Sequence, residues 1–291
     1  MKNILICLLI ILALVVMFLV KFVFGYEVHR NVKYGEADCE IMDIFIPKEA
    51  YERQSNGCVL FIHGGSWSGG DKSEEEIMCR YLASRGYITA TMNYSLYSDE
   101  RADSYNVDMV LDEIDAALAK IKSFAADRGI TVDKAATSGY SAGAHLSMLY
   151  SFSREENSPL SIEFTANLAG PADFRFEIWG RNLTVRIGEM LSGVDITEQM
   201  IENGEAEKIF EKISPVSYIS ADTPPSIFAY GGRDKVVSAK NGESIRARLD
   251  AIGASYDYVF FPHSSHAMIE NLGKRLSYVG AVADYCEKYF D

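Results

Sequence analysis

The sequence has few cysteines, with five in 291 residues, and none of them is arranged as a CxxC or Cys/His ligand motif. Without that spacing, a structural zinc site is not expected. Cys58 falls in an apolar stretch and Cys7 in a longer one, where a free cysteine behaves as a small hydrophobic residue. This distribution disfavours a disulfide-dense scaffold.

Positive charge is also scarce: 28 Lys and Arg residues stand against 41 Asp and Glu, for a net charge of −13. No Lys/Arg cluster offsets this excess, so nucleic acids and anionic lipid surfaces are disfavoured as partners. Internal repeats and low-complexity linkers are absent as well. The length that follows the N-terminal apolar segment therefore suits one large domain, residues 26–291, and leaves its oligomeric state open.

One long apolar run is present, at residues 4–20, and residues 22–24 extend it past Lys21. It is long enough to cross the hydrocarbon core of a bilayer, and the flank that follows lacks a small-x-small cleavage site. We therefore expect residues 1–25 to be an uncleaved transmembrane anchor with an extracytoplasmic domain behind it. The alternative is a cleaved signal peptide and a secreted protein.

Apolar stretches and stretches of helical spacing alternate through the rest of the chain, after antiparallel strands within residues 32–46. The expected strands are 58–62, 87–92, 135–138, 161–168, 225–230 and 256–261. The expected helices are 74–85, 106–126, 142–152, 239–252 and 268–289. This alternation predicts an α/β fold, with a mostly parallel central sheet and helices on both faces.

The motif Gly139-Tyr140-Ser141-Ala142-Gly143 follows one predicted strand and opens a helix. G-x-S-x-G in that setting is typical of the nucleophile elbow of a serine hydrolase. A tight strand-to-helix turn strains the serine backbone, and the two glycines remove side chains that would collide there. The N–H of Ala142 is the expected first donor to an oxyanion, at the positive end of the helix dipole.

A second motif, His63-Gly64-Gly65-Ser66-Trp67, follows the apolar run at 58–62. It resembles the HGGG loop of lipases and esterases, in which glycines let backbone N–H groups point at a substrate carbonyl. By position, Gly65 and Ser66 are the expected further oxyanion donors. Ser66 stands where esterases often have a third glycine, so Trp67 is the alternative to Ser66 as the second donor of this loop. His63 is expected to brace the loop.

A nucleophilic serine needs a base, and the base needs an orienting carboxylate. Asp234 follows the strand predicted at 225–230, on the edge where open α/β sheets bind ligands. Two histidines, His263 and His266, follow the last predicted strand, and one of them should be the base. The chain order Ser, acid, His is that of α/β hydrolases.

These motifs make the chain resemble an α/β hydrolase of the hormone-sensitive-lipase and acetyl-esterase type, a group that includes bacterial xylan-side-chain esterases and kynurenine formamidase-like enzymes. The resemblance implies a triad of Ser141, Asp234 and His266, with His263 as the spare. It also implies a helical cap at about residues 173–220. Trp67, Tyr140 and Trp179 are expected to border the substrate pocket.

The expected activity is that of a carboxylesterase acting on small or short-acyl esters, acetylated carbohydrate included, without metal or organic cofactor. Acyl transfer through Ser141 needs only the triad and the oxyanion donors. The alternatives are an arylformamidase-like amidase, a non-catalytic binding protein on the same fold, and an envelope scaffold in which the membrane anchor matters most.

Overall fold

The computed structural model of the chain describes residues 21–291. The apolar run at residues 4–20, which carries the predicted anchor, lies outside the described residues. Within residues 21–291, no helix combines the length and the apolar character needed to cross a bilayer.

The centre of the molecule is an eight-stranded sheet with the order β1-β2-β4-β3-β5-β6-β7-β8. Its strands are β1 (Tyr26–Lys33), β2 (Ile41–Pro47), β3 (Asn56–Ile62), β4 (Ile88–Met92), β5 (Val132–Tyr140), β6 (Ser161–Leu168), β7 (Ser226–Gly231) and β8 (Tyr256–Phe261). β2 pairs antiparallel with β1 and with β4, and the other pairings are parallel. The predicted α/β class and mostly parallel sheet are confirmed.

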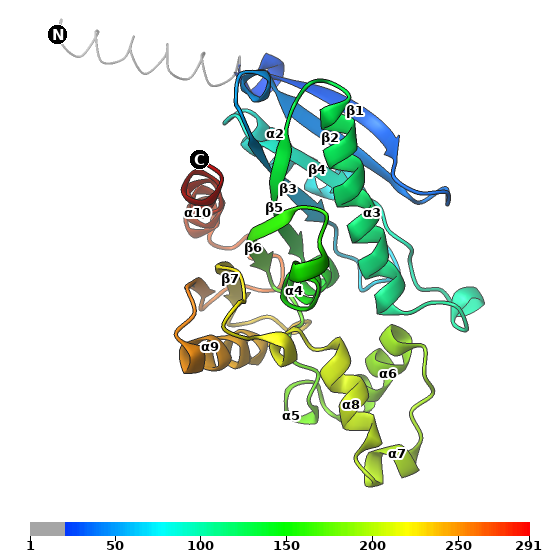
Figure 1. Cartoon of the computed structure of the whole chain (residues 1–291). Helices are drawn as coiled ribbons and strands as arrows, with labels where there is room; N and C mark the ends of the chain where they lie inside the picture. Colours follow the sequence, from blue (N-terminus) through cyan, green and yellow to red (C-terminus); the bar gives the residue numbers. More distant parts are fainter. Residues whose placement is uncertain (1–20) are drawn as a thin grey trace, which may run out of the picture.

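Helices cover both faces of this sheet (Figure 1). One face carries α3 (Val107–Ala126), α4 (Ala142–Ser153) and α9 (Lys240–Ile252), and the other carries α2 (Glu76–Ala83) and α10 (Leu272–Phe290). Two neighbouring residues of β3 show why the sequence of a parallel strand is apolar at every position. Leu60 packs toward α3 and α4 while Val59 packs toward α2 and α10, so both side chains are buried.

Single-turn 3₁₀ helices join several of these elements. They are η1 (Lys48–Tyr51), η2 (Lys72–Glu75), η3 (Asp99–Arg101), η4 (Glu155–Asn157) and η5 (Pro215–Tyr218). The helix expected over 74–85 divides accordingly into η2 and α2. The last helix begins at Leu272 rather than at 268, because Met268 has a left-handed φ of 53° and the Asn271 side chain accepts the N–H of Lys274.

The insertion expected at residues 173–220 is helical and lies between β6 and β7 in the chain. It consists of α5 (Phe176–Trp179), α6 (Arg181–Ser192), α7 (Glu198–Glu202) and α8 (Glu205–Ile213), followed by η5. Figure 1 shows these helices gathered beyond one end of the sheet. We call residues 173–220 the cap.

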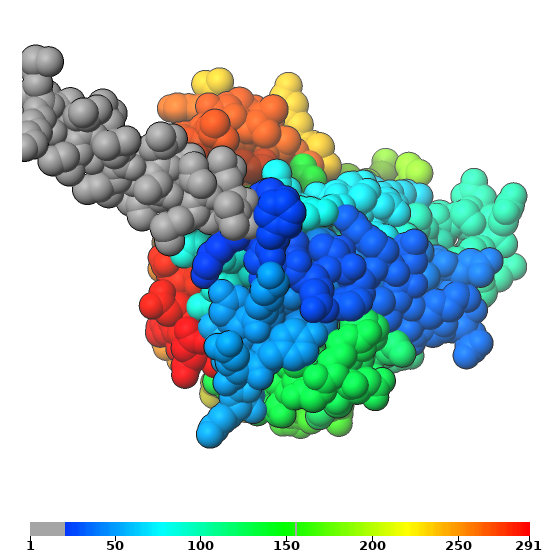
Figure 2. Space-filling model, turned by 90° about the horizontal axis from the view of Figure 1, so that it is seen from above, coloured from blue at the N-terminus to red at the C-terminus, as the bar shows by residue number. Residues whose placement is uncertain are grey.

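The N-terminal strands lie at the opposite end of the molecule from the cap. Figure 2 views that end, where the dark-blue segment that begins at Lys21 lies across the surface near the red C-terminal helix. β3, β5, β7 and β8 all run in the same direction, because every pairing that links them in the sheet is parallel. The loops that follow these four strands therefore meet at one edge of the sheet, which is where the motif residues lie.

Candidate active site

Ser141 is the turn residue between β5 and α4, with φ 55° and ψ −119°. This conformation is strained for a residue with a side chain. A Cβ at Gly139 would lie 2.4 Å from the backbone carbon of Gly143, and a Cβ at Gly143 would lie 1.9 Å from the carbonyl oxygen of Ile62. Both glycines of the motif are therefore required for close backbone approach, as the sequence predicted.

The side chains of Ser141, His266 and Asp234 form one hydrogen-bonded chain. Ser141 Oγ lies 2.9 Å from His266 Nε2, and His266 Nδ1 lies 2.6 Å from Asp234 Oδ2. Because a carboxylate only accepts, Nδ1 carries the proton, and Nε2 is left to accept from the serine hydroxyl. The structure thus brings together the three side chains that the sequence selected.

Asp234 is held by its own loop. Its side chain is fully buried, and Oδ1 accepts the backbone N–H groups of Val236 at 2.8 Å and Val237 at 2.9 Å. Both carboxylate oxygens are thereby occupied, which fixes the orientation of the His266 ring. Gly231 allows the two loops to meet, since a Cβ there would lie 2.6 Å from the carbonyl oxygen of Ser264.

The two candidate histidines occupy different environments. His266 contacts both Ser141 and Asp234, whereas His263 is exposed on the turn that ends β8 and hydrogen-bonds to neither of them. The geometry separates the two residues, which sequence spacing alone left as alternatives.

The segment after β3, residues 63–71, forms a tight loop beside Ser141, which we call the oxyanion loop. Gly65 has a φ of 109°, and its carbonyl accepts the N–H groups of Ser68 and Gly69 at 3.1 and 3.0 Å. His63 is buried and stacks on Tyr94, with ring centroids 4.4 Å apart. Its Nδ1 bonds to the carbonyl of Gly64 at 2.7 Å, so its ring braces the loop.

Two of the three predicted oxyanion donors reach the cavity beside Ser141. Ser66 and Ala142 line it, whereas Gly65 is not among its lining residues. Within residues 21–291, no hydrogen bond is made by the backbone N–H of Gly65, Ser66 or Ala142 to a protein acceptor. All three N–H groups are thus without a protein acceptor, and those of Ser66 and Ala142 belong to residues that line the cavity.

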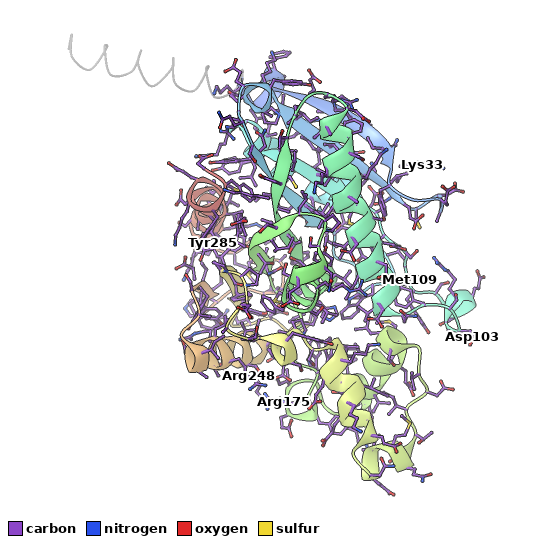
Figure 3. All side chains as sticks on the ribbon, in the orientation of Figure 1. Lys33, Asp103, Met109, Arg175, Arg248 and Tyr285 are labelled. Atoms are coloured by element: carbon purple, nitrogen blue, oxygen red, sulfur yellow. The ribbon has the colours of Figure 1, made fainter. Side chains whose placement is uncertain are left out.

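The cavity above Ser141 has a volume of about 940 Å³ and lies between the oxyanion loop, the β7 loop and the cap. Its larger apolar lining residues are Trp67, Pro171, Trp179, Leu183, Ile187, Met190, Val194, Val236 and Val237. Its charged lining residues are mostly acidic, with Asp99, Asp103, Glu189 and Asp195 beside Arg186. Figure 3 shows Asp103 at the tip of the loop before α3, beside the cap.

Of the three predicted pocket residues, Trp67 and Trp179 line the cavity and Tyr140 does not. Tyr140 ends β5 with its ring on the α10 side of the sheet, where its centroid lies 5.0 Å from that of His266. Side chains of a strand alternate between its two faces, and Tyr140 at the end of β5 falls on the α10 face. Ser141, the next residue, lines the cavity instead.

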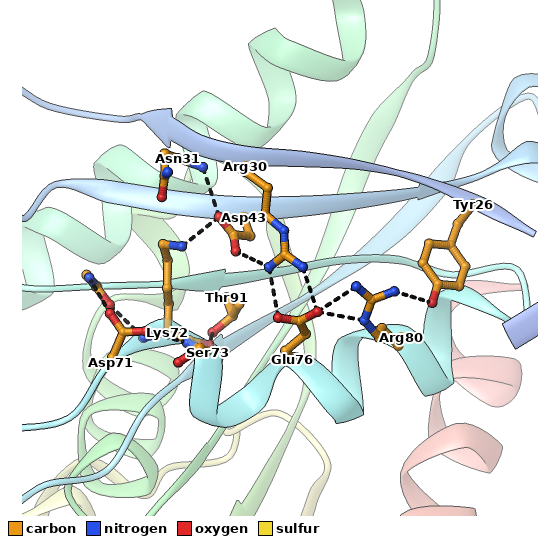
Figure 4. A network of polar contacts seen from close by, with 11 residues as sticks. Tyr26, Arg30, Asn31, Asp43, Asp71, Lys72, Ser73, Glu76, Arg80 and Thr91 are labelled. Atoms are coloured by element: carbon orange, nitrogen blue, oxygen red, sulfur yellow. Dashed lines mark hydrogen bonds and ion pairs between the residues drawn. The ribbon is translucent and has the colours of Figure 1, made fainter. Parts of the chain in front are cut away.

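The far end of the oxyanion loop is held by a polar network (Figure 4). Asp43 on β2 is fully buried and accepts from Lys72 Nζ at 2.8 Å and from Arg30 at 2.6 Å. The N–H of Lys72 donates to Asn93 Oδ1 at 2.6 Å. Burial opposes ionisation of Asp43, yet these hydrogen bonds lower its pKa below the ordinary value.

Sequence reasoning missed two residues of this region. From the sequence alone, Lys72 would be expected at the surface, because no local pattern predicts that it pairs with Asp43. The sequence presents His145 as an ordinary helix residue, although its position one turn after Ser141 places it beneath that serine. Within the described part of the chain, no group of three or more His, Cys, Asp or Glu side chains is placed to hold a metal ion.

A model of the BD-FAE family matches residues 42–249 of this chain. Esterase LipC of Mycobacterium tuberculosis is 25% identical over 256 residues, which cover 83% of this chain and 60% of that protein. The isoprenylcysteine alpha-carbonyl methylesterase ICME of Arabidopsis thaliana is 24% identical, over 84% of this chain and 58% of that protein. The chain thus spans little more than half the length of these curated relatives.

Solved structures show the same fold. A truncated carbohydrate esterase from gut microbiota superposes with a TM-score of 0.73 at 17% identity, covering 91% of this chain and 97% of that one. Esterase B from Lactobacillus rhamnosis gives a TM-score of 0.69 at 17% identity, over 95% and 92% of the two chains. These similarities confirm the predicted α/β-hydrolase fold and the resemblance to esterases.

Proposed function

This chain belongs to the BD-FAE family, and we propose that it hydrolyses carboxylic esters through Ser141, His266 and Asp234. The observation that carries the proposal is the continuous chain of two hydrogen bonds, at 2.9 and 2.6 Å, from the serine hydroxyl to the buried carboxylate. Esterases among its relatives support the same reaction class.

In the first step, Ser141 Oγ attacks the ester carbonyl while its proton passes to His266 Nε2. The tetrahedral intermediate then expels the alkoxide, which takes that proton from His266 and leaves as the alcohol. Water attacks the resulting acyl-enzyme with His266 again as base, and collapse releases the acid and restores Ser141. Asp234 stays ionised throughout and stabilises the imidazolium.

The negative charge on the substrate oxygen falls between the N–H groups of Ser66 and Ala142. Each such donor contributes about 3 kcal/mol of transition-state stabilisation, because it is already oriented before the charge develops. The N-terminus of α4 adds its dipole to the same position.

The size of the cavity favours esters in which either the acyl or the alcohol portion is large. A volume of about 940 Å³ is at the upper end of the range for small-molecule sites, and a short acyl group fills little of it. We therefore propose a short-acyl ester of a bulky alcohol, acetylated carbohydrate included, as the substrate class. Trp179 and Met190 supply an apolar surface for one face of that alcohol.

The test is hydrolysis of p-nitrophenyl esters from acetyl to palmitoyl by a chain that begins near residue 21, with Ser141→Ala alongside. Turnover confined to short acyl chains and lost in Ser141→Ala supports the proposal. Turnover of a formylated aromatic amine in preference to esters favours an amidase, a class represented among the relatives by kynurenine formamidase of Salmo salar. No turnover and no labelling by a fluorophosphonate favours a binding protein.

We also propose that residues 1–25 anchor the chain in a membrane with the catalytic domain on the extracytoplasmic side, on the strength of the apolar run at 4–20. Membrane fractionation of the full chain, followed by protease treatment of intact cells, tests both parts. Release of the domain into the medium would instead indicate a cleaved signal peptide.

A further inference from the structure

The oxyanion loop holds three consecutive residues at positive φ: Gly65 at 109°, Ser66 at 53° and Trp67 at 60°. Positive φ costs about 1 kcal/mol or more for each residue that carries a side chain, so the surroundings must hold Ser66 and Trp67 in place. The backbone carbonyl of Trp67 accepts the N–H of Tyr97 at 2.8 Å, and Trp67 as a whole is 5% exposed. The conformation of the loop therefore depends on where the indole is fixed.

The polar atom of that indole is fixed by His145. Trp67 Nε1 donates to His145 Nδ1 at 3.1 Å, and the two rings meet edge to face with centroids 5.3 Å apart. His145 is fully buried on α4, and its backbone N–H donates to the backbone carbonyl of Ser141 at 3.0 Å. One histidine thus connects the oxyanion loop to the first turn of the helix that carries the nucleophile.

The second ring nitrogen of His145 reaches the cap. Because Nδ1 accepts from Trp67, Nε2 carries the proton, and it donates to the carbonyl of Ile213 at 2.8 Å. Ile213 is the last residue of α8, where helix carbonyls lack intrahelical partners. Phe174, at the start of the cap, packs on both rings, with centroids 6.3 Å from Trp67 and 5.3 Å from His145.

We propose that His145 is a positioning residue that sets the oxyanion loop through Trp67 and couples its geometry to the docking of α8. The inference rests on the proposed esterase function. A histidine that only filled space in the core would not need hydrogen-bond partners on two different segments. In His145, Nδ1 accepts from Trp67 on the oxyanion loop and Nε2 donates to Ile213 on α8. When α8 is docked, Nε2 is held as the donor, and Nδ1 is thereby kept as the acceptor that the indole needs.

Three substitutions distinguish the hydrogen bond between His145 and Trp67 from the one between His145 and Ile213. An asparagine amide reaches about as far as Nδ1, so His145→Asn keeps an acceptor for Trp67 and loses Ile213. A glutamine amide reaches about as far as Nε2, so His145→Gln keeps a donor for Ile213 and loses the acceptor. Trp67→Phe removes the indole donor and keeps an aromatic ring in the loop.

We expect Trp67→Phe and His145→Gln to lower kcat by 10- to 100-fold with KM changed by less than about threefold, because an oxyanion contact acts in the transition state. We expect His145→Asn to keep kcat within about fivefold of the wild type and to raise KM. Exhaustive labelling with a fluorophosphonate counts competent Ser141 sites, so that kcat is expressed per competent site even if a variant folds incompletely.

The matched control is Thr137→Val, which removes a buried hydroxyl that bonds to Ser147 on α4, away from the oxyanion loop. It should lower the melting temperature and leave kcat per site unchanged. Unchanged kcat per site in both Trp67→Phe and His145→Gln overturns the inference, as does an equal loss in Thr137→Val. Failure of the esterase proposal gives a different result, since the wild type itself would then neither turn over esters nor be labelled.

Discussion

Gly143 lies so close to Ile62 that a methyl group on its Cα would stand 1.9 Å from the Ile62 carbonyl oxygen. This contact brings the start of α4 against the end of β3, and it is why Ser141 and the oxyanion loop are neighbours. Their relative position is therefore set by backbone packing between two central elements, before any side chain of the triad is considered.

Gly143→Ala is expected to destabilise the fold by about 3 kcal/mol and to lower activity, because the new methyl group meets backbone that cannot rotate away. Denaturant unfolding and ester turnover measure the two effects. Gly280→Ala is the matched control, since a Cβ at Gly280 on α10 meets open space. That change should be neutral or stabilising by up to about 1 kcal/mol, and equal losses in both variants would contradict the steric argument.

His266→Ala is expected to remove most ester turnover, about 10³-fold or more, whereas His263→Ala should leave it within about twofold. The reason is that only His266 contacts both Ser141 and Asp234. Steady-state kinetics on one short-chain ester compares the two variants directly. Near-normal turnover in His266→Ala would refute the assignment.

Much of this site could be predicted because its chemistry is local in the sequence. Ser141 and Asp234 each follow an apolar strand at the edge where loops converge, so strand order alone brings them together. His266 could be preferred over His263 only by resemblance, because both follow the same strand. The partner of Lys72 depends on packing between distant segments that no local pattern records, since Asp43 lies 29 residues away on another strand.

Ser141→Gly and Ser141→Ala should both be inactive, yet differ in stability. The backbone of Ser141, at φ 55° and ψ −119°, suits glycine and strains alanine. We expect Ser141→Gly to have the greater unfolding free energy, by about 1 kcal/mol. Denaturant unfolding of the two variants gives the difference, and an equal or lower value for Ser141→Gly would show that the turn stores no strain.

His145 should make the fold sensitive to mild acid. Burial lowers the pKa of His145 from 6.5 to about 4, so the folded protein binds fewer protons than the unfolded chain between those values. The contribution of neutral His145 to the free energy of unfolding is fully present above pH 6.5 and is lost as the pH falls to about 4. Burial also lowers the pKa of His63, which adds to the loss with the same sign.

His145→Gln cannot titrate, so the variant should lose less stability than the wild type between pH 6.5 and 4. Unfolding free energies at several pH values in that window measure the difference. A variant whose stability falls in parallel with that of the wild type would assign the acid sensitivity to other groups.

A buried ion pair lies at the far end of the oxyanion loop. Lys72 and Asp43 lie 2.8 Å apart, and their side chains are 10% and 0% exposed. Lys72→Met leaves the Asp43 carboxylate buried with one cation fewer, and we expect a loss of about 3 kcal/mol in unfolding free energy.

Lys21→Met breaks a pair of similar length, 3.1 Å to Glu49, between side chains that are 58% and 42% exposed. Solvent screens that pair, so its loss should cost less than about 1 kcal/mol. Denaturant unfolding of both variants at neutral pH makes the comparison. Equal losses would mean that Asp43 does not depend on Lys72, and that Arg30 and the N–H of Asn31 suffice for its carboxylate.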